Sequence, residues 1–454
     1  MRSGVLALLA LAASGCAPLG PNYARPPVPT PTLYRSAALV QAESLADAPW
    51  WRVFEDPQLQ ALIREALDSN LDVRAAIARV DFARAQAGIA KSFLRPQVDG
   101  VASYTAQQHM GDDVLHGGEY GFQLSWELDL FGRIRREHEA AVARLLASEQ
   151  GHRGVLVTLV GDVTSTYFLL RQLDLELDIA RRTLATNDQT VEYFQNRLDG
   201  GVSNRLEVDR IRANRARTAA SIPDLEQQIG IAENALSVLL GRRPDEIVRD
   251  PVAPAFAEPP RIPPGMPVSL LERRPDILQA EQLLVAANAN VGAARAQFFP
   301  AISLTGLVGA LSGDLTSLLG GSGGVWTVTP SLLQPVYQGG RLKRNLEAAR
   351  AQVAEAVAVY QQSALNGYRE VADALVAIAK LAEVRVQREA GVAALRDGTM
   401  LARDRYESGL ASYIEILTAD QQLFDEELLL AQTRGAEFRA RSALYRALGG
   451  GWQP

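Results

Sequence analysis

The chain has 454 residues, of which 47% are hydrophobic and 22% are charged, so it can bury a large folded core and is not a disordered chain. Its formal net charge at pH 7 is -6, and its lysines and arginines are scattered along the sequence. A nucleic-acid partner is therefore not expected, because a phosphate backbone is bound by clustered cations.

The N-terminus has the layout of a bacterial secretion signal that ends at the only cysteine of the chain. A basic Arg2, a short apolar run and small residues precede Cys16, and a single cysteine leaves no internal disulfide. Residues 13–15 resemble the lipobox of bacterial lipoproteins, and Ala17 resembles the position that sorts such lipoproteins to the outer membrane. We expect a signal peptide at 1–15 and a covalent lipid on Cys16; the alternative is an ordinary cleavable signal with an incidental cysteine.

A proline-rich segment follows the cysteine, and helical structure begins after it. The stretch ARPPVPTPT cannot form a helix, so residues 16–48 are predicted to be an extended, acylated tether. Asp56 and Pro57 have the positions of a helix cap and a first-turn proline. Apolar residues at spacings of three and four then continue to Pro96, which predicts helical structure packed closely on its neighbours.

Alternation of apolar and polar residues predicts four strands, two in each half of the chain. The clearest case is GEYGFQLSWELDLFGR, residues 118–133, and residues 98–105, 302–308 and 326–332 alternate in the same way. Each segment has about the ten residues of a tilted transmembrane strand. The positions expected to face the membrane are Tyr120, Phe122, Leu124, Trp126, Trp326 and Val328.

These strands are the expected means of crossing a membrane, because no stretch after the signal approaches about 18 uninterrupted apolar residues. Four strands cannot close a barrel, and an edge exposed to lipid would leave backbone hydrogen bonds unsatisfied. Several copies of the chain must then share one barrel. The secretion signal favours this interpretation, while alternation alone leaves open a soluble sheet packed on the helices.

A very long helix is predicted after the second strand. It opens near Gly132, carries a coiled-coil seam of apolar residues, and runs to the Gly200-Gly201 pair. At 1.5 Å per residue this helix is roughly 100 Å long. Its antiparallel partner runs from about Asn204 to Leu240.

The chain then repeats this unit. Residues 49–240 form the first repeat and residues 268–448 the second. Each repeat is predicted to contain, in this order, a helix, two strands, a very long helix, a tight turn and a final helix. Three residues of the first half recur 208 positions later: Arg197, Gly201 and Glu207 correspond to Arg405, Gly409 and Glu415. Proline-rich residues 241–267 read as an equatorial linker, and residues 449–454 as a C-terminal tail.

With these features the chain resembles the TolC-like outer-membrane factors, most closely the NodT-type efflux lipoproteins. The residues that carry the resemblance are GCAPLGPNYARPPVP, APWWRVFEDPQL, SNLDVRAAIARVDFARA, FFPAISL and RRPDILQAEQLL. The resemblance implies a mixed α/β, mostly α membrane protein that forms a homotrimeric duct. Its long antiparallel helical barrel crosses the periplasm, and four strands per chain contribute to a shared transmembrane β-barrel. It also implies a periplasmic adaptor and an inner-membrane efflux pump as partners, with the pump selecting the exported compound.

The resemblance further implies a gate at the periplasmic helix tips, where the family places carboxylates and a tyrosine. The corresponding residues are Tyr406, Gly409 and Glu415, with Glu207, Gly200 and Gly201 at the duplicate tip. Ala411 stands where some members have arginine, and Thr418 where many have aspartate. We expect one Glu415 per chain to form a narrow ring that favours cations; the alternative is a solvated glutamate on a helix surface.

The leading interpretation is a non-enzymatic, lipid-anchored outer-membrane channel that passes small molecules outward in multidrug export. The first alternative is a periplasmic coiled-coil scaffold lipoprotein without a channel. A remote alternative is an acyl-hydrolase with Ser322 as its nucleophile. The sequence GGSGG around Ser322 matches the nucleophile-elbow motif, but that motif needs a helix after the serine and a strand is predicted there. The four histidines lack the spacing of metal ligands, so no metal or other cofactor is expected.

Overall fold

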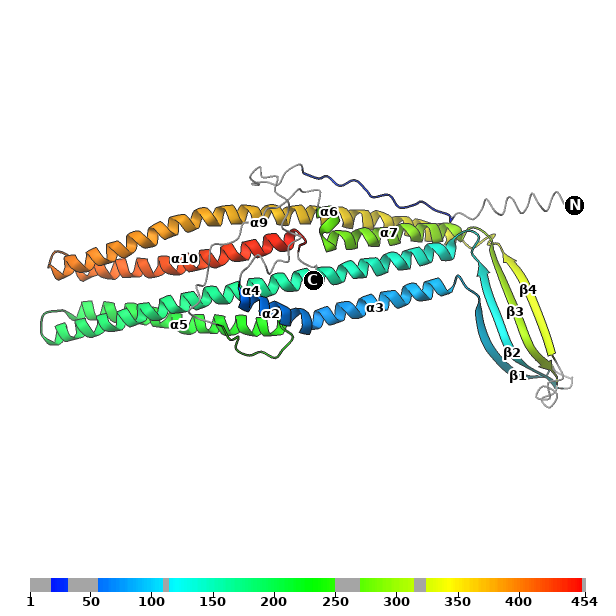
Figure 1. The fold of residues 1–454 in the computed structure, drawn as a ribbon, viewed down its shortest axis with the longest axis horizontal. Coiled ribbons are helices and arrows are strands. Elements are labelled where there is room, and N and C mark those ends of the chain that lie inside the picture. Colours follow the sequence, from blue (N-terminus) through cyan, green and yellow to red (C-terminus); the bar gives the residue numbers. More distant parts are fainter. Residues whose placement is uncertain (1–17, 32–55, 109–113, 250–269, 314–323, 451–454) are drawn as a thin grey trace. The chain divides into compact units, whose positions relative to one another are not determined.

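The computed structural model describes residues 18–31, 56–108, 114–249, 270–313 and 324–450 (Figure 1). Cys16, Ser322 and most of the predicted linker lie outside these described residues. The first half contains α2 (Pro57–Ser69), α3 (Leu71–Ser92), β1 (Gln97–Gln107), β2 (Leu115–Leu128), α4 (Arg133–Asp199) and α5 (Arg205–Leu239). The second half contains α6 (Leu270–Arg273), α7 (Pro275–Ala296), β3 (Ala301–Ser312), β4 (Gly324–Leu333), α9 (Arg341–Glu407) and α10 (Tyr413–Ala447).

The two halves have matching long elements, which confirms the predicted internal duplication. The helices α4 and α9 are each 67 residues long, and α5 and α10 are each 35. Two compact units cut across this duplication. The strand unit comprises Met1–Val28, Ile77–Gly151 and Leu278–Ser363, and the tip unit comprises Pro29–Ala76, His152–Ile277 and Ala364–Pro454. Each unit therefore contains segments of both halves.

The helical stretch predicted before Pro96 is interrupted, which is a correction to the sequence analysis. Asp56 caps α2 as expected, but Asn70 leaves the helical conformation with ψ 133°. The side-chain oxygen of Asn70 accepts a hydrogen bond from the Val73 amide at 3.1 Å and so caps α3. Its side-chain nitrogen donates to the carbonyl of Leu239, at the end of α5, at 2.9 Å.

A similar joint separates α6 from α7 in the second half. Arg274 lies between these helices, and its Nη1 donates to the carbonyl of Ala447, at the end of α10, at 2.8 Å. The buried guanidinium also pairs with Asp276 at 2.6 Å and with Glu370 at 2.8 Å. In both halves the returning helix is thus fixed to the joint by its last carbonyls.

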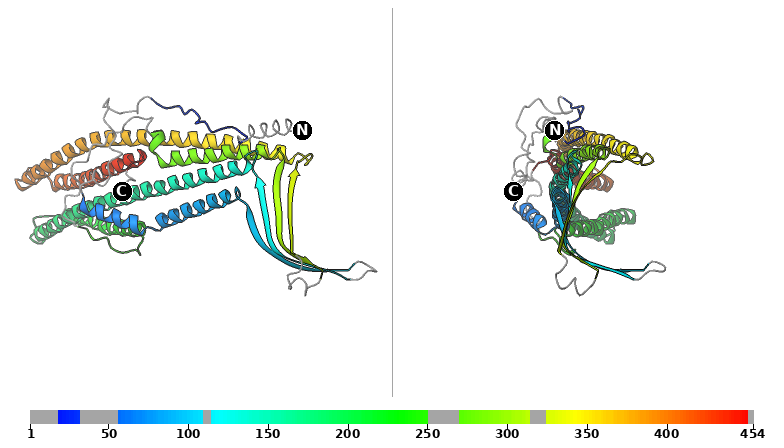
Figure 2. Two further views of the ribbon diagram at one scale, coloured as in Figure 1. Left: turned by 45° about the vertical axis from the view of Figure 1, so that its right-hand side comes forward. Right: turned by 90° about the vertical axis from the view of Figure 1, so that its right-hand side faces the viewer.

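The four strands form one antiparallel sheet in the order β1-β2-β3-β4, and Figure 2 shows this sheet as a single curved layer. Its register aligns the apolar positions across the strands, because Phe122 lies opposite Val308, and Val308 lies opposite Trp326. Phe122 is 66% exposed and Trp326 is 75% exposed. The predicted alternation is therefore confirmed, and it places an exposed apolar face on the sheet.

The opposite face of the sheet is polar. The Ser303 and Ser331 hydroxyls lie 2.6 Å apart, and the Ser103 hydroxyl donates to Glu119 at 3.2 Å. Polar side chains thus find partners across neighbouring strands, as expected for a face in contact with water.

Closely packed alanines join the helices of the strand unit. Ala140 and Ala143 of α4 pack against Ala286 and Ala289 of α7, and these four side chains are buried. A second cluster joins α7 to α9 through Val291, Ala294 and Ala349. Small side chains allow the helix backbones to approach closely.

The N-terminal segment 18–28 is extended and is held by the strand unit. The buried guanidinium of Arg136 donates to the Leu19 carbonyl at 3.1 Å and to Asn22 Oδ1 at 3.0 Å. The buried Glu281 carboxylate accepts from the Tyr23 hydroxyl at 2.9 Å and pairs with Arg25 at 2.7 Å. These contacts fix the segment that follows the predicted lipid anchor.

By length and composition, one described helix, α4, could cross a membrane. Its apolar 18-residue window has a mean hydropathy of 1.2, and half of that window is buried inside the protein. Such burial is also typical of a core helix, so this feature is weak evidence for a transmembrane helix.

Candidate functional site at the helix tips

The two hairpins of the tip unit end in turns of the same backbone geometry. In the first turn the Val202 amide donates to the Arg197 carbonyl at 2.9 Å, and in the second the Leu410 amide makes the equivalent bond at 2.9 Å. Gly201 and Gly409 both have φ +74°, a left-handed conformation that favours glycine. Both turns are Schellman motifs, which explains why the glycines recur in the two halves.

The glutamates that follow the turns occupy equivalent positions but have different partners. Asn204 caps α5 by accepting a hydrogen bond from the Glu207 amide at 3.0 Å, and the Glu207 carboxylate accepts from the Ser203 hydroxyl at 2.7 Å. Glu415 instead lies 3.7 Å from Arg405, and both side chains are about half exposed. The Glu207 carboxylate thus stabilises its own turn, whereas the Glu415 carboxylate faces a solvated cation.

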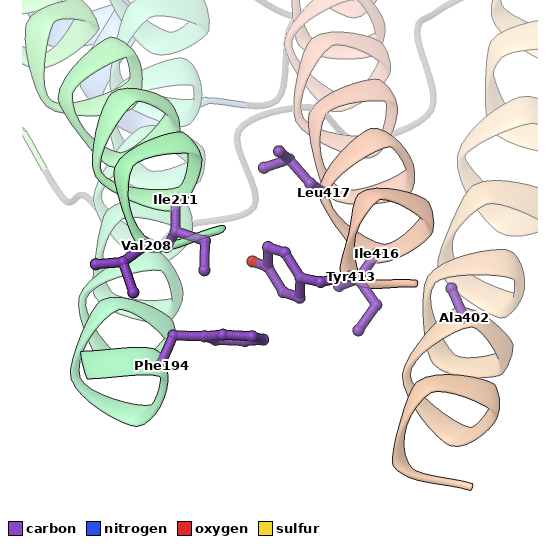
Figure 3. Packing of buried hydrophobic residues seen from close by; sticks show 7 residues of the cluster. All are labelled: Phe194, Val208, Ile211, Ala402, Tyr413, Ile416 and Leu417. Atoms are coloured by element: carbon purple, nitrogen blue, oxygen red, sulfur yellow. The ribbon is translucent and has the colours of Figure 1, made fainter. Parts of the chain in front are cut away.

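A hydrophobic cluster joins the two hairpins near their tips (Figure 3). Its buried members are Phe194, Val208 and Ile211 from the first hairpin, and Ala402, Tyr413, Ile416 and Leu417 from the second. The Tyr413 ring lies 4.2 Å from the Phe194 ring, measured between centroids. The ring of Tyr406 lies 5.7 Å from Phe194 and 5.9 Å from Tyr413. Aromatic contacts therefore connect the α4–α5 hairpin to the α9–α10 hairpin.

A cation reinforces this contact. The Arg197 guanidinium lies 5.6 Å from the Tyr193 ring centroid and 5.7 Å from the Tyr406 ring centroid. Its Nη1 also donates to the Tyr193 hydroxyl at 3.1 Å. Burial raises the pKa of Tyr406, so this phenol stays neutral beside the cation. Arg197 thus connects an aromatic ring of its own helix to one of the other hairpin.

Beside the cluster lies a cavity of about 240 Å³ between α4, α9 and α10. The Asp420 carboxylate lines it and pairs with Arg403 at 3.1 Å. Burial raises the pKa of Asp420, and the positive charge of Arg403 opposes that shift. The cavity therefore has a compensated charge pair at one wall and aromatic rings at another.

Polar contacts join the hairpins farther from the turns. Arg217 of α5 donates to both carboxylate oxygens of Asp425 of α10, at 2.8 and 3.0 Å. These two residues occupy the same position in the two halves, 208 residues apart. Nearby, the Gln421 amide donates to Asn214 Oδ1 at 2.9 Å. We refer to the pair Arg217 and Asp425 as the clasp.

A buried carboxyl lies still farther along the contact between α4 and α10. Glu176 accepts hydrogen bonds from Gln172 at 2.6 Å and from Gln432 at 3.1 Å. Burial raises the pKa of Glu176 above its ordinary value, and the two amide hydrogen bonds oppose the rise. Arg439 donates to Gln172 at 2.7 Å, and its positive charge also opposes the rise in the pKa of Glu176.

The structure places the six predicted gate residues at the two tips. The first tip holds Gly200, Gly201 and Glu207, and the second holds Tyr406, Gly409 and Glu415. Their role as a gate stays a prediction. The sequence analysis missed Phe194, Tyr413 and the clasp, and it identified Arg197 only as a repeated residue without a role at the tip. Arg197 had a visible signal, since it recurs as Arg405, whereas Phe194 and Tyr413 look like ordinary residues of a helix seam.

The six predicted membrane-facing residues lie on the apolar face of the sheet. Tyr120, Phe122, Trp326 and Val328 are exposed, whereas Leu124 and Trp126 are half-buried. Trp126 Nε1 donates to the Leu94 carbonyl at 3.3 Å. Within the described ranges, no group of three or more His, Cys, Asp or Glu residues is arranged to hold a metal ion.

Comparisons with known proteins agree with this arrangement. The sequence matches the family model described as outer membrane efflux protein over residues 62–242 and 266–450. It is 35% identical over 450 residues to the cation efflux system protein CusC of Escherichia coli O6:H1, covering 98% of both chains. It is 33% identical to the probable outer membrane lipoprotein SilC of Salmonella typhimurium, covering 97% of this chain and 96% of that one. The structure also matches the open state of the MtrE outer membrane channel of Neisseria gonorrhoeae, with a TM-score of 0.88, 30% identity, and 96% and 99% of the two chains covered.

Proposed function

The chain belongs to the outer membrane efflux protein family, and we propose that three copies of it form one efflux duct that opens at its helix tips. The protein is an outer-membrane efflux channel with a periplasmic extension, and it is not an enzyme. This sets aside the hydrolase alternative on Ser322. The number of copies, the gate and the partners are the parts proposed here.

The sheet supports the sharing of one barrel between copies. The strands β1 and β4 lie at the ends of the strand order, so each offers one edge to another strand. In hydrocarbon such an edge must be paired, because its backbone groups find no water there. Pairing of β4 with β1 of the next copy closes the ring, and three copies give twelve strands. The number three follows the family resemblance.

The single observation that supports the proposed gate is the hydrophobic cluster between the two hairpins. Phe194 and Tyr413 come from different hairpins and are both buried by this contact. Movement of one hairpin away from the other would separate these rings and the clasp, so both stabilise the state in which the hairpins lie together. A relative, MtrE, has been crystallised in a state described as open. We infer that the α9–α10 hairpin moves away from the α4–α5 hairpin during opening.

The Glu415 carboxylates supply the cation preference in this proposal. Three half-exposed carboxylates at a narrow ring repel one another and attract cations, and each Arg405 at 3.7 Å reduces that field without neutralising it fully. Single-channel recording of Glu415→Ala tests this role, and a loss of cation preference is expected. Glu207→Ala is the matched control, because its carboxylate is bound by Ser203. Unchanged selectivity of Glu415→Ala, or an equal change in both variants, would remove Glu415 from the gate.

A periplasmic adaptor and an inner-membrane pump are the proposed partners, and a covalent lipid on Cys16 is the proposed anchor. The relative CusC is named as part of a cation efflux system, and SilC as a probable outer membrane lipoprotein. Cross-linking and co-purification from native membranes test the partners and the oligomer together. Recovery of a monomer without partners would contradict this assembly.

Conductance in planar bilayers tests the channel itself against the scaffold alternative. The purified protein is expected to conduct ions and to fractionate with the outer membrane even after Cys16→Ser, because the sheet holds it there. Release of Cys16→Ser as a water-soluble protein without conductance would favour the scaffold.

A further inference from the structure

The contact between α4 and α7 shows how two neighbouring helices pack in the strand unit. α4 follows β2 along the chain, α7 precedes β3, and β2 pairs with β3. The two helices meet through four buried alanines: Ala140, Ala143, Ala286 and Ala289. Farther from the sheet, the Gln279 side chain lies beside Gly151. The residue numbers rise in opposite directions along this contact, so α4 and α7 are antiparallel.

The helices α3 and α9 lie at the two ends of the same layer. Within the strand unit, Figures 1 and 2 show the helix order α3, α4, α7 and α9, just as β1 and β4 lie at the ends of the strand order. Val80 and Ala87 are buried on one side of α3. Its opposite side is also apolar but is exposed, and consists of Ala78, Phe82, Ala85 and Ile89. Phe82 is 66% exposed, so among the described residues nothing covers this second side of α3.

α9 has a matching side of small residues. Ala348, Ala351 and Ala358 are exposed there, whereas Ala349 and Tyr360 are buried on the opposite side. α9 has the same length as α4, and α3 has the same length as α7. The four alanines of the α4–α7 contact, taken in order, have these equivalents: Ala348, Ala351, Phe82 and Ala85. The exposed sides of α3 and α9 are therefore equivalent to the sides that α7 and α4 bury against each other.

The strand order brings these two exposed sides together when copies of the chain share a sheet. α9 follows β4 along the chain, and α3 precedes β1. Pairing of β4 with β1 of the next copy places α9 beside α3 of that copy, in the way that pairing of β2 with β3 places α4 beside α7. The helix contact continues the strand pairing, so a second copy of the chain is the partner that fits the uncovered side of α3.

A pair of opposite charges completes the match. Ala147 and Leu283 lie at one level of the α4–α7 contact, between its four alanines and Gly151. Their equivalents are Glu355 in α9 and Arg79 in α3. Both charged side chains are exposed, and within the described ranges neither is in an ion pair. Two apolar residues of the contact within the chain are thus replaced by complementary charges at the ends of the layer.

We propose that α3 of one copy packs against α9 of the next copy, with Phe82 on Ala348 and Ala351 and with Arg79 paired to Glu355. The proposal deepens the proposed function and rests on the sharing of one barrel between copies. Phe82 stands where the contact within the chain has an alanine, so its ring buries more apolar area between copies. The ion pair fixes the level at which the two helices meet.

Disulfide trapping in the full-length protein tests this contact. Ala85→Cys combined with Ala348→Cys places one thiol on each helix, at the level where Ala289 and Ala140 meet within the chain. Mild oxidation in native membranes is expected to join the copies, and complete oxidation to link three copies into a ring. Ala85→Cys combined with Arg350→Cys is the matched control and should not link. Arg350 is exposed on nearly the opposite side of α9 from Ala348, because each residue advances about 100° round a helix.

Exchange of subunits between differently tagged oligomers tests the ion pair. Arg79→Glu places two carboxylates opposite each other, so it is expected to weaken each contact by about 1.4- to 5-fold, the effect of one exposed ion pair, and to speed exchange. Arg79→Glu combined with Glu355→Arg should restore the parent rate. Arg84→Glu is the matched control, because Arg84 pairs with Asp81 at 2.6 Å within α3, and it should exchange like the parent.

Several outcomes would overturn the proposal. Equal linking of both cysteine pairs would do so, as would no link in either, or a double reversal that exchanges as fast as Arg79→Glu. Complete labelling of Ala85→Cys by a water-soluble maleimide in the assembled protein would show that no second copy covers this side of α3. Conductance and oligomer size separate this contact from the channel. A conducting trimer that does not link contradicts only the contact, whereas a monomer that does not conduct contradicts the shared barrel.

Discussion

Reversal of the clasp should open the closed state, and reversal of both charges should close it again. Arg217→Asp places two carboxylates opposite each other, and Asp425→Arg places two guanidiniums there. An exposed ion pair is worth about 0.2–1 kcal/mol, and the two side chains are 54% and 49% exposed. In the proposed trimer, three clasps that separate together would then contribute about 0.6–3 kcal/mol, a shift of roughly 3- to 150-fold in the closed-to-open ratio.

The assay is the open probability of single channels in planar bilayers. Each single reversal is expected to raise it, the double reversal to restore the parent value, and high salt to reduce the differences. Arg215→Asp is the matched control, because Arg215 pairs with Asp188 at 2.7 Å within the first hairpin and has similar exposure. An equal opening by Arg215→Asp, or a double reversal that stays open, would refute the reasoning.

Three further predictions concern the cluster, the buried carboxyl and the N-terminal segment. Tyr413→Ala should weaken the contact between hairpins by about 3–5 kcal/mol and raise the open probability, whereas Tyr413→Phe keeps the buried ring and should behave like the parent. The pKa of Glu176 is raised in the folded protein, so ionisation of this carboxyl lowers the stability as the pH rises from the ordinary pKa through the raised one. Glu176→Gln should therefore raise the midpoint of thermal unfolding at neutral pH and reduce the pH dependence of that midpoint in weak acid. A lower midpoint in Glu176→Gln would contradict this. Arg136→Gln should release the N-terminal segment, which chymotrypsin would report as faster cleavage after Tyr23; cleavage at the parent rate would show that Arg136 does not hold it.

Local sequence rules predicted the elements that depend on neighbouring residues. Asp56 and Pro57 begin a helix because a cap and a first-turn proline act within one turn. Gly201 and Gly409 end helices because their left-handed conformation is a local requirement. The strands were predictable because apolar and polar residues alternate along them. This alternation arises when only one face of a sheet is buried or faces the membrane.

The missed features depend on residues far away in the sequence. Asn70 caps α3 locally through the Val73 amide, but its bond to the carbonyl of Leu239, 169 residues later, could not be read from neighbouring residues. The packing of Phe194 against Tyr413 depends on how two hairpins meet, and periodicity shows only that each residue lies on an apolar side of its helix. Functional roles of the tip residues likewise depended on the family resemblance and not on the pattern of the residues.

The clasp has an evolutionary consequence. Arg217 and Asp425 descend from one ancestral position, and an ancestor built from two identical halves would have set like charges against each other there. Opposite charges at this place require that the two halves have diverged from each other. The two hairpins are therefore not interchangeable, and in the proposed ring of three chains every second hairpin would be free to specialise in movement.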